Sequence, residues 1–136
     1  MSAEAFVEAL DAVPYARFLG VSALAGSADT GIMAYAGHLI GNPLLPALHG
    51  GSVAAFMELT AAAALRAHTG RSAKPIDVSI AYLRSGRPVE TRARATLRKV
   101  GRRVAYVHVL AWQDDEASPT AELSAHFLLP SADPGL

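Results

Sequence analysis

One carboxylate stands alone in the most apolar stretch of the chain. Glu58 is the only charged residue between His49 and Arg66, within a run of alanines, leucines, phenylalanine and methionine. An ionised carboxylate is costly to bury unless it is paired or used in chemistry, where it can act as a nucleophile or as a general base. We therefore treat Glu58 as a candidate catalytic residue; the alternative is a buried acid that only bonds a polar neighbour.

The turn before Glu58 offers the complementary partial charge. His49 is followed by Gly50 and Gly51, which permit a close approach of the backbone. The first N–H groups of a helix have no partner inside it and carry partial positive charge, so they can stabilise an oxyanion. We expect Gly50 and Gly51 to supply such donors within reach of Glu58, and Ser52 to cap the helix. His49 is expected to be a hydrogen-bonding turn residue rather than a base.

A long helix must carry both groups. Residues 53–65 are helix formers and apolar residues on every face, a pattern typical of a helix that is enclosed on all sides. Gly70 is expected to end this helix. A shorter amphipathic helix is predicted over residues 3–10, capped by Ser2 and ended near Pro14.

Six segments have the periodicity of strands. Two short apolar runs within residues 17–35 predict a hairpin, and residues 38–48, which contain two prolines, are expected to form a loop. Four later runs are predicted as strands, at residues 77–83, 89–97, 104–112 and 121–129. The order predicts an α+β fold in which an antiparallel sheet wraps around one long buried helix. We expect a single domain over residues 1–136, with a frayed tail at about residues 130–136.

Composition limits the classes of function. The chain has 136 residues, of which 51% are hydrophobic and 18% charged, so we expect apolar surface to be buried in an oligomer. A net charge of +0 argues against bulk electrostatic binding to nucleic acid or to a membrane. With no cysteine and no histidines at metal-binding spacing, we expect no metal site. The absence of a basic leader or a long apolar span predicts a cytoplasmic protein.

Several motifs together point to a known family. The turn His49-Gly50-Gly51 opens an apolar helix, and a carboxylate follows nine residues after the histidine. Further matching segments are Phe18-Leu19-Gly20-Val21, Ile80-Ala81-Tyr82-Leu83-Arg84 and Val100-Gly101-Arg102-Arg103-Val104-Ala105. In these features the chain resembles the hotdog-fold acyl-CoA thioesterases of the PaaI-like and 4-hydroxybenzoyl-CoA thioesterase group. The resemblance implies hydrolysis of an acyl-CoA thioester. It also implies a homodimer whose sheets join edge to edge, and two such dimers could form a homotetramer. No cofactor is expected, because CoA is part of the substrate.

The resemblance also implies roles for individual residues. A backbone N–H of the glycine turn, here that of Gly51, polarises the thioester carbonyl, and Glu58 acts as nucleophile or as general base, commonly from the other subunit. Asn42 takes the place of an amide that orients water or the carbonyl, one residue farther from His49 than the family pattern. The CoA phosphates are expected to meet basic residues at strand ends and turns, namely Arg84, Arg87, Arg102 and Arg103. A solvated strand face is the alternative for these arginines.

Two other functions are compatible with the sequence. The segment from His38 to Pro46 is similar to the His-x-x-Gly-x-Pro-x-x-Pro motif of hotdog-fold hydratases and dehydratases, in which His38 would be the base. Against this, Ala47 replaces a glycine of that motif, and Glu58 lies six residues beyond the expected acid. A non-catalytic acyl-CoA binding protein would keep the fold without turnover. Small apolar residues around Glu58 favour an aromatic or medium-chain acyl group.

Overall fold

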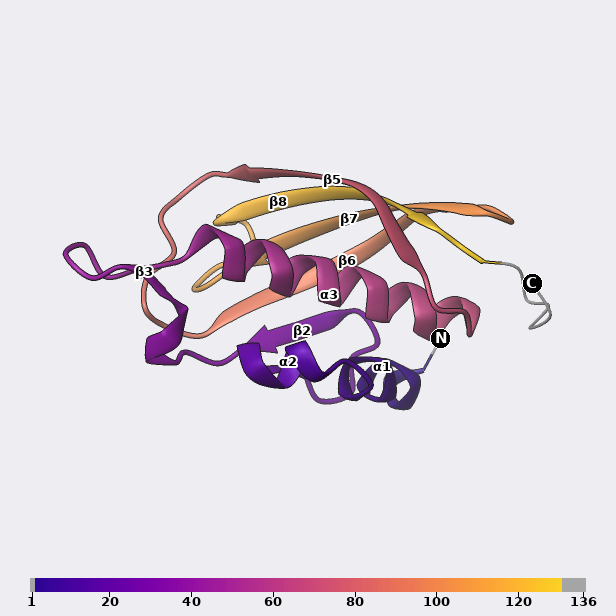
Figure 1. Cartoon of the computed structure of the whole chain (residues 1–136), viewed down its shortest axis with the longest axis horizontal. Coiled ribbons are helices and arrows are strands. Elements are labelled where there is room, and N and C mark those ends of the chain that lie inside the picture. The colour runs from indigo at the N-terminus through magenta and orange to yellow at the C-terminus, as the bar shows by residue number, and fades with distance from the viewer. Residues whose placement is uncertain (1, 131–136) are drawn as a thin grey trace.

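A six-stranded antiparallel sheet carries one long helix across one of its faces (Figure 1). The computed structural model describes residues 2–130. In the order β1-β2-β6-β7-β8-β5 the strands are β1 (Val21–Ala23), β2 (Thr30–Met33), β6 (Thr91–Val100), β7 (Val104–Trp112), β8 (Ala121–Leu128) and β5 (Lys74–Tyr82). The helices are α1 (Ala3–Asp11), α2 (Pro14–Leu19) and α3 (Gly50–Thr69). This arrangement confirms the predicted fold class, an antiparallel sheet wrapped around one helix.

Alternation along the strands places one face of the sheet against α3. Every second residue of β6 and β8 is buried on this face: Thr91, Ala93 and Ala95, then Ala121, Leu123, Ala125 and Phe127. From α3, Phe56, Met57 and Ala64 are fully buried against them. Each large apolar side chain removed from water contributes about 1.5 to 3 kcal/mol. The core therefore fixes the register of the strands and the rotation of α3 about its axis.

The predicted start of α1 and the predicted end of α3 agree with the structure. Ser2 caps α1 by accepting the N–H of Ala5 at 3.1 Å, and Gly70 ends α3 in a left-handed conformation with φ of 72°. Between α1 and β1, however, Pro14 begins the short helix α2, because proline is favoured in the first turn of a helix. The predicted hairpin of residues 17–35 is confirmed by the pairing of β1 with β2.

Residues 38–48 contain more structure than the predicted loop. They include most of the 3-10 turn η1 (Gly37–Leu39) and a small hairpin of β3 (Ile40–Asn42) and β4 (Ala47–Leu48). Prolines at 43 and 46 suit the hairpin because both lie in its connection, where no ladder hydrogen bond is required. The predicted tail at residues 131–136 lies outside the described part of the chain.

One face of α3 is open, which differs from the predicted enclosure. Ala54, Ala55, Glu58, Leu59 and Ala62 are only partly buried. They recur at helical spacing opposite the residues that face the sheet, so they form one stripe directed away from it. A single chain covers this stripe only in part, so α3 is less enclosed in the protomer than the apolar pattern predicts.

The edge strand β5 is also uncovered. It pairs only with β8, and its register places Val78, Ile80 and Tyr82 on the helix side of the sheet. Because α3 lies mainly over the inner strands, Val78 and Tyr82 remain 41% and 52% exposed. A long strand edge with unpaired backbone groups and exposed apolar side chains is a template for pairing with another strand.

None of the helices within residues 2–130 is long and apolar enough to cross a membrane.

Arg71 joins three chain segments at the end of α3. Its guanidinium group donates to the carbonyl oxygens of Leu129 at 3.0 Å, Pro130 at 2.9 Å and Arg102 at 3.1 Å. Arg71 thus holds the two residues that follow β8 and the β6–β7 turn against the helix, in a set of charge-assisted hydrogen bonds.

We predict that Arg71→Ala lowers the free energy of unfolding by about 1 to 3 kcal/mol, because the lost hydrogen bonds involve a charged donor. Urea unfolding followed by circular dichroism measures the change. Arg98→Ala is the matched control, since Arg98 is exposed on β6 and is expected to change stability by less than about 0.5 kcal/mol. Equal effects of the two variants would contradict a clamping role for Arg71.

Candidate active site

A cavity of about 360 Å³ opens at the N-terminal end of α3. Its walls come from β4, α3, the end of β5 and the start of β8, and include Leu48, Gly50, Val53, Tyr82, Arg84 and Ala121. The lining combines apolar side chains with the glycine turn and the polar residues Tyr82, Arg84, Ser85 and Thr120. The structure therefore places the glycine turn and Arg84, both predicted from the sequence, on the same cavity.

His49, and not Ser52, is the N-cap of α3. The Nδ1 atom of His49 accepts the N–H of Gly51 at 2.8 Å, which requires an imidazole without a proton on that nitrogen. Ser52 lies inside the first turn, and its hydroxyl donates to the His49 carbonyl at 2.7 Å. The expectation that Ser52 caps the helix was wrong. The helix α3 begins at Gly50, two residues before Ser52, and the imidazole of His49 accepts an N–H of its first turn. His49 is found in the turn role that its sequence position favours.

Among the residues that the structure describes, the N–H of Gly50 has no acceptor. The N–H of Gly51 is engaged by His49, and those of Ser52 and Val53 point to the His49 carbonyl at 3.0 and 3.3 Å. The His49–Gly50 peptide thus has a carbonyl that accepts several hydrogen bonds and an N–H that is open. Such a peptide is polarised, and its N–H is a stronger donor.

Glu58 lies half-buried on the open stripe of α3. No side chain or backbone N–H within residues 2–130 is hydrogen-bonded to its carboxylate. Eight residues of helix separate it from Gly50, a distance of about 12 Å along the axis. The backbones of the two residues therefore lie about two helical turns apart within one chain.

Asn42 uses its side chain within its own hairpin. Its Oδ1 atom accepts the N–H groups of Leu44 and Leu45 at 3.0 and 3.3 Å, the geometry of a turn closed by asparagine. It is exposed and does not line the cavity at the start of α3. The structure thus does not bring Asn42 to the glycine turn within one chain.

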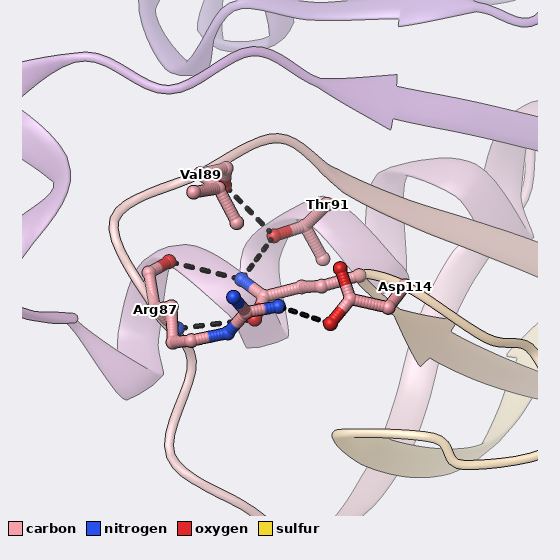
Figure 2. A network of polar contacts seen from close by, with 5 residues as sticks. Arg87, Val89, Thr91 and Asp114 are labelled. Carbon is pink, nitrogen blue, oxygen red and sulfur yellow. Dashed lines mark hydrogen bonds and ion pairs between the residues drawn. The ribbon is translucent and has the colours of Figure 1, made fainter.

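The four arginines fall into two separate pairs. Arg84 lines the main cavity and a second, polar cavity of about 290 Å³ beside it, where no ion pair engages it within the described residues. Arg87 lies nearby but is paired with Asp114 and held by Gln113 through both backbone groups (Figure 2). Arg102 and Arg103 lie in the β6–β7 turn, next to the last turn of α3. The 20-residue helix separates the two pairs by about 30 Å.

His38, which would be the base of a hydratase, makes a contact with α2 in the structure. The Nε2 atom of His38 donates to the carbonyl of Phe18 at 2.8 Å, and its ring packs on the Phe18 ring with centroids 4.8 Å apart. This nitrogen is engaged in holding η1 against α2.

Within residues 2–130 no group of three or more metal-binding side chains is present.

Sequence reasoning did not identify Tyr82 as a contact of the glycine turn. Its hydroxyl donates to the carbonyl of Gly50 at 2.7 Å. No local pattern marks this contact, because 32 residues separate the two partners. The only signal is the glycine itself, since a Cβ at position 50 would lie 3.1 Å from the tyrosine ring.

Comparisons with known proteins agree with this architecture. A family model described as thioesterase superfamily matches residues 45–120. A solved structure from the same superfamily is 26% identical and has a TM-score of 0.86, with 93% of this chain and 97% of that chain covered. A Chromobacterium violaceum protein is 35% identical, with a TM-score of 0.72 and coverage of 96% of this chain and 93% of that chain.

A third solved structure contains a ligand. It is a Bacillus halodurans protein with CoA, 19% identical, with a TM-score of 0.74 over 93% of this chain and 87% of that chain. At this identity the likeness concerns the fold alone. No curated protein matches the chain.

We predict that Gly41→Ala disturbs the cap of α3. A Cβ at position 41 would lie 2.8 Å from the Cα of His49, so the backbone of the cap must shift. The expected loss of stability is about 1 to 3 kcal/mol, measured by chemical unfolding. Gly37→Ala is the control, because a Cβ there meets no atom within 4 Å; a loss as large for Gly37→Ala would refute the steric explanation.

Proposed function

The chain belongs to the thioesterase superfamily, and on this basis we propose that it hydrolyses an acyl-CoA thioester to a free acid and CoA. The observation that carries the proposal is the open N–H of Gly50 on the wall of the cavity at the start of α3. A single polarised donor at a helix N-terminus suits the oxygen of a thioester carbonyl, which becomes an oxyanion during attack. The CoA in the Bacillus halodurans structure supports the choice of carrier.

In the proposed reaction the thioester oxygen accepts the Gly50 N–H, while Gly51 keeps its bond to His49. Glu58 acts either as a base, taking a proton from the attacking water, or as a nucleophile whose acyl anhydride is then hydrolysed. As a base, Glu58 takes a proton from water while the new C–O bond forms, and returns it to the CoA sulfur as the C–S bond breaks. As a nucleophile, Glu58 forms the C–O bond itself and expels CoA as a thiolate, and water then hydrolyses the anhydride and releases the acid together with the proton that the thiolate takes up. The half-buried, unpaired carboxylate of Glu58 is free for either role.

We propose that the site is completed by a second copy of the chain. The separation of about 12 Å along α3 leaves Glu58 too far from the Gly50 donor of its own chain. The uncovered stripe of α3 and the exposed edge of β5 provide apolar area and backbone groups for a partner. Antiparallel pairing of two β5 strands would join the two sheets and relate the two subunits by a twofold axis.

The same pairing of β5 strands would bring Arg84 of one subunit near Arg102 and Arg103 of the other. Arg84 lies beyond the end of β5, whereas Arg102 and Arg103 lie near its beginning, since Lys74 and Val104 both face Leu128. Antiparallel pairing of β5 brings the end of one protomer beside the beginning of the other. We propose Arg84 of one subunit and the Arg102–Arg103 turn of the other as contacts for CoA phosphates, with Arg87 weaker because Asp114 neutralises it.

We predict that Glu58→Gln lowers kcat by at least about 100-fold, because glutamine can neither accept the proton nor form the acyl intermediate. Release of CoA from a panel of aryl- and medium-chain acyl-CoA esters is followed with a thiol reagent, to which a cysteine-free protein gives no background. Glu122→Gln on the exposed face of β8 is the control and should retain full activity.

Failure of the wild-type protein to release thiol from any ester would reject hydrolysis. Enoyl-CoA hydration would then be tested with His38→Ala, which should abolish a hydratase activity but change a thioesterase little. Saturable binding of the esters without turnover would instead support a non-catalytic binding protein.

We predict that Gly50→Pro lowers kcat by about 100- to 1000-fold, the usual cost of losing an oxyanion donor. Proline removes the N–H yet suits the first helical position, since His49 already has φ of −62° and ψ of 130°. Gly50→Ala is the matched control, because it adds a Cβ beside Tyr82 but keeps the donor. An equal loss in both variants would show that bulk, not the N–H, matters.

We predict that Glu58→Gln and Gly50→Pro restore activity when refolded together in equal amounts. Random pairing makes half of the dimers mixed, and each mixed dimer has one intact site of two if the groups come from different subunits. Activity should reach about a quarter of the wild-type value. If both groups of a site come from one chain, the mixture stays as inactive as the separate variants.

A further inference from the structure

The peptide between Gly50 and Gly51 is held from both sides. Its carbonyl oxygen accepts the Tyr82 hydroxyl at 2.7 Å, and its N–H donates to Nδ1 of His49 at 2.8 Å. One partner comes from the end of β5 and the other from the residue that caps α3. Both ends of a single peptide plane are therefore fixed by side chains.

The two glycines make these contacts possible. A Cβ at position 50 would lie 3.1 Å from the Cζ and hydroxyl oxygen of Tyr82, and one at position 51 would lie 2.9 Å from Nδ1 of His49. Neither glycine has a positive φ, so neither is required by backbone conformation. The glycine pair is instead explained by the close approach of the phenol ring and the imidazole to the peptide between them.

A glycine at position 50 does not by itself fix the direction in which the Gly50 N–H points. The Gly50 N–H lies in the peptide plane between His49 and Gly50. The angle between this plane and the next one is set by the φ and ψ of Gly50, and glycine has the widest freedom in both. The peptide before it is fixed by the bonds to the His49 carbonyl, and the peptide after it by Tyr82 and His49. With the planes on both sides held, Gly50 is held between them, and a preorganised donor costs no reorganisation during reaction.

We propose that Tyr82 is a positioning residue, whose hydroxyl fixes the Gly50–Gly51 peptide and thereby aims the Gly50 N–H at the substrate carbonyl. The assignment rests on the proposed function for the identity of that carbonyl. Tyr82 does not touch the reacting atoms in this scheme. It also links the donor to β5, the strand through which a second subunit is proposed to pair, so the direction of the donor depends on order in that strand.

The test is Tyr82→Phe, which removes the hydroxyl and keeps the ring that lines the cavity. The expected result is a fall in kcat of about 3- to 10-fold, the range for one neutral hydrogen bond, with KM changed less than about twofold. Tyr15→Phe is the matched control, because Tyr15 is similarly exposed on α2 and lies away from the cavity. Size-exclusion chromatography confirms that the variants keep the oligomeric state of the wild type.

A second readout does not depend on activity. In two-dimensional amide NMR, Tyr82→Phe should shift the Gly50 and Gly51 resonances and speed hydrogen exchange at Gly51 by about 3- to 10-fold, whereas Tyr15→Phe should do neither. Unchanged glycine amides would overturn the proposal, as would altered amides with an unchanged kcat. If the wild type hydrolyses no ester, the proposed function fails, and the glycine amides alone decide whether Tyr82 holds the turn.

Discussion

The structure of the site depends on an imbalance at the start of α3, where backbone donors outnumber acceptors. A helix leaves its first N–H groups without partners, and residues 2–130 supply acceptors for those of Gly51, Ser52 and Val53 but not for that of Gly50. A buried donor without a partner costs free energy, whereas a donor on a cavity wall is available to a ligand. The local stability of the turn and its proposed role as an oxyanion donor thus rest on one arrangement of hydrogen bonds.

Most of the fold could be predicted because it follows from periodicity. Alternating residues in β6 and β8 and the apolar run of α3 specify elements whose buried faces have one efficient arrangement. The side-chain contacts of the glycine turn could not be predicted in the same way. The cap by His49 competes with a serine of better intrinsic capping propensity, and the Tyr82 contact depends on how β5 passes the helix. Tertiary packing decides both.

Composition predicted enclosure of α3, and the single chain leaves a stripe of it open. The two facts agree if hydrophobic composition reflects the assembled protein rather than one protomer. Ala54, Ala55 and Ala62 suit a surface that another chain can approach closely, and β5 presents a free edge beside exposed Val78. The apolar pattern of α3 therefore supports the proposed association of two chains as well as the core of one chain.

The geometry of a helix supports the proposal that two chains form the site. An oxyanion donor must lie at the N-terminus, where N–H groups are free, while a carboxylate close to that end would itself bond those groups and occupy them. Placing Glu58 two turns farther along keeps the Gly50 donor open, at the cost of a separation of about 12 Å. A twofold axis removes this cost, because it can bring the middle of one helix to the beginning of another. The distance that prevents self-capping is thus the same distance on which the proposal of a two-chain site rests.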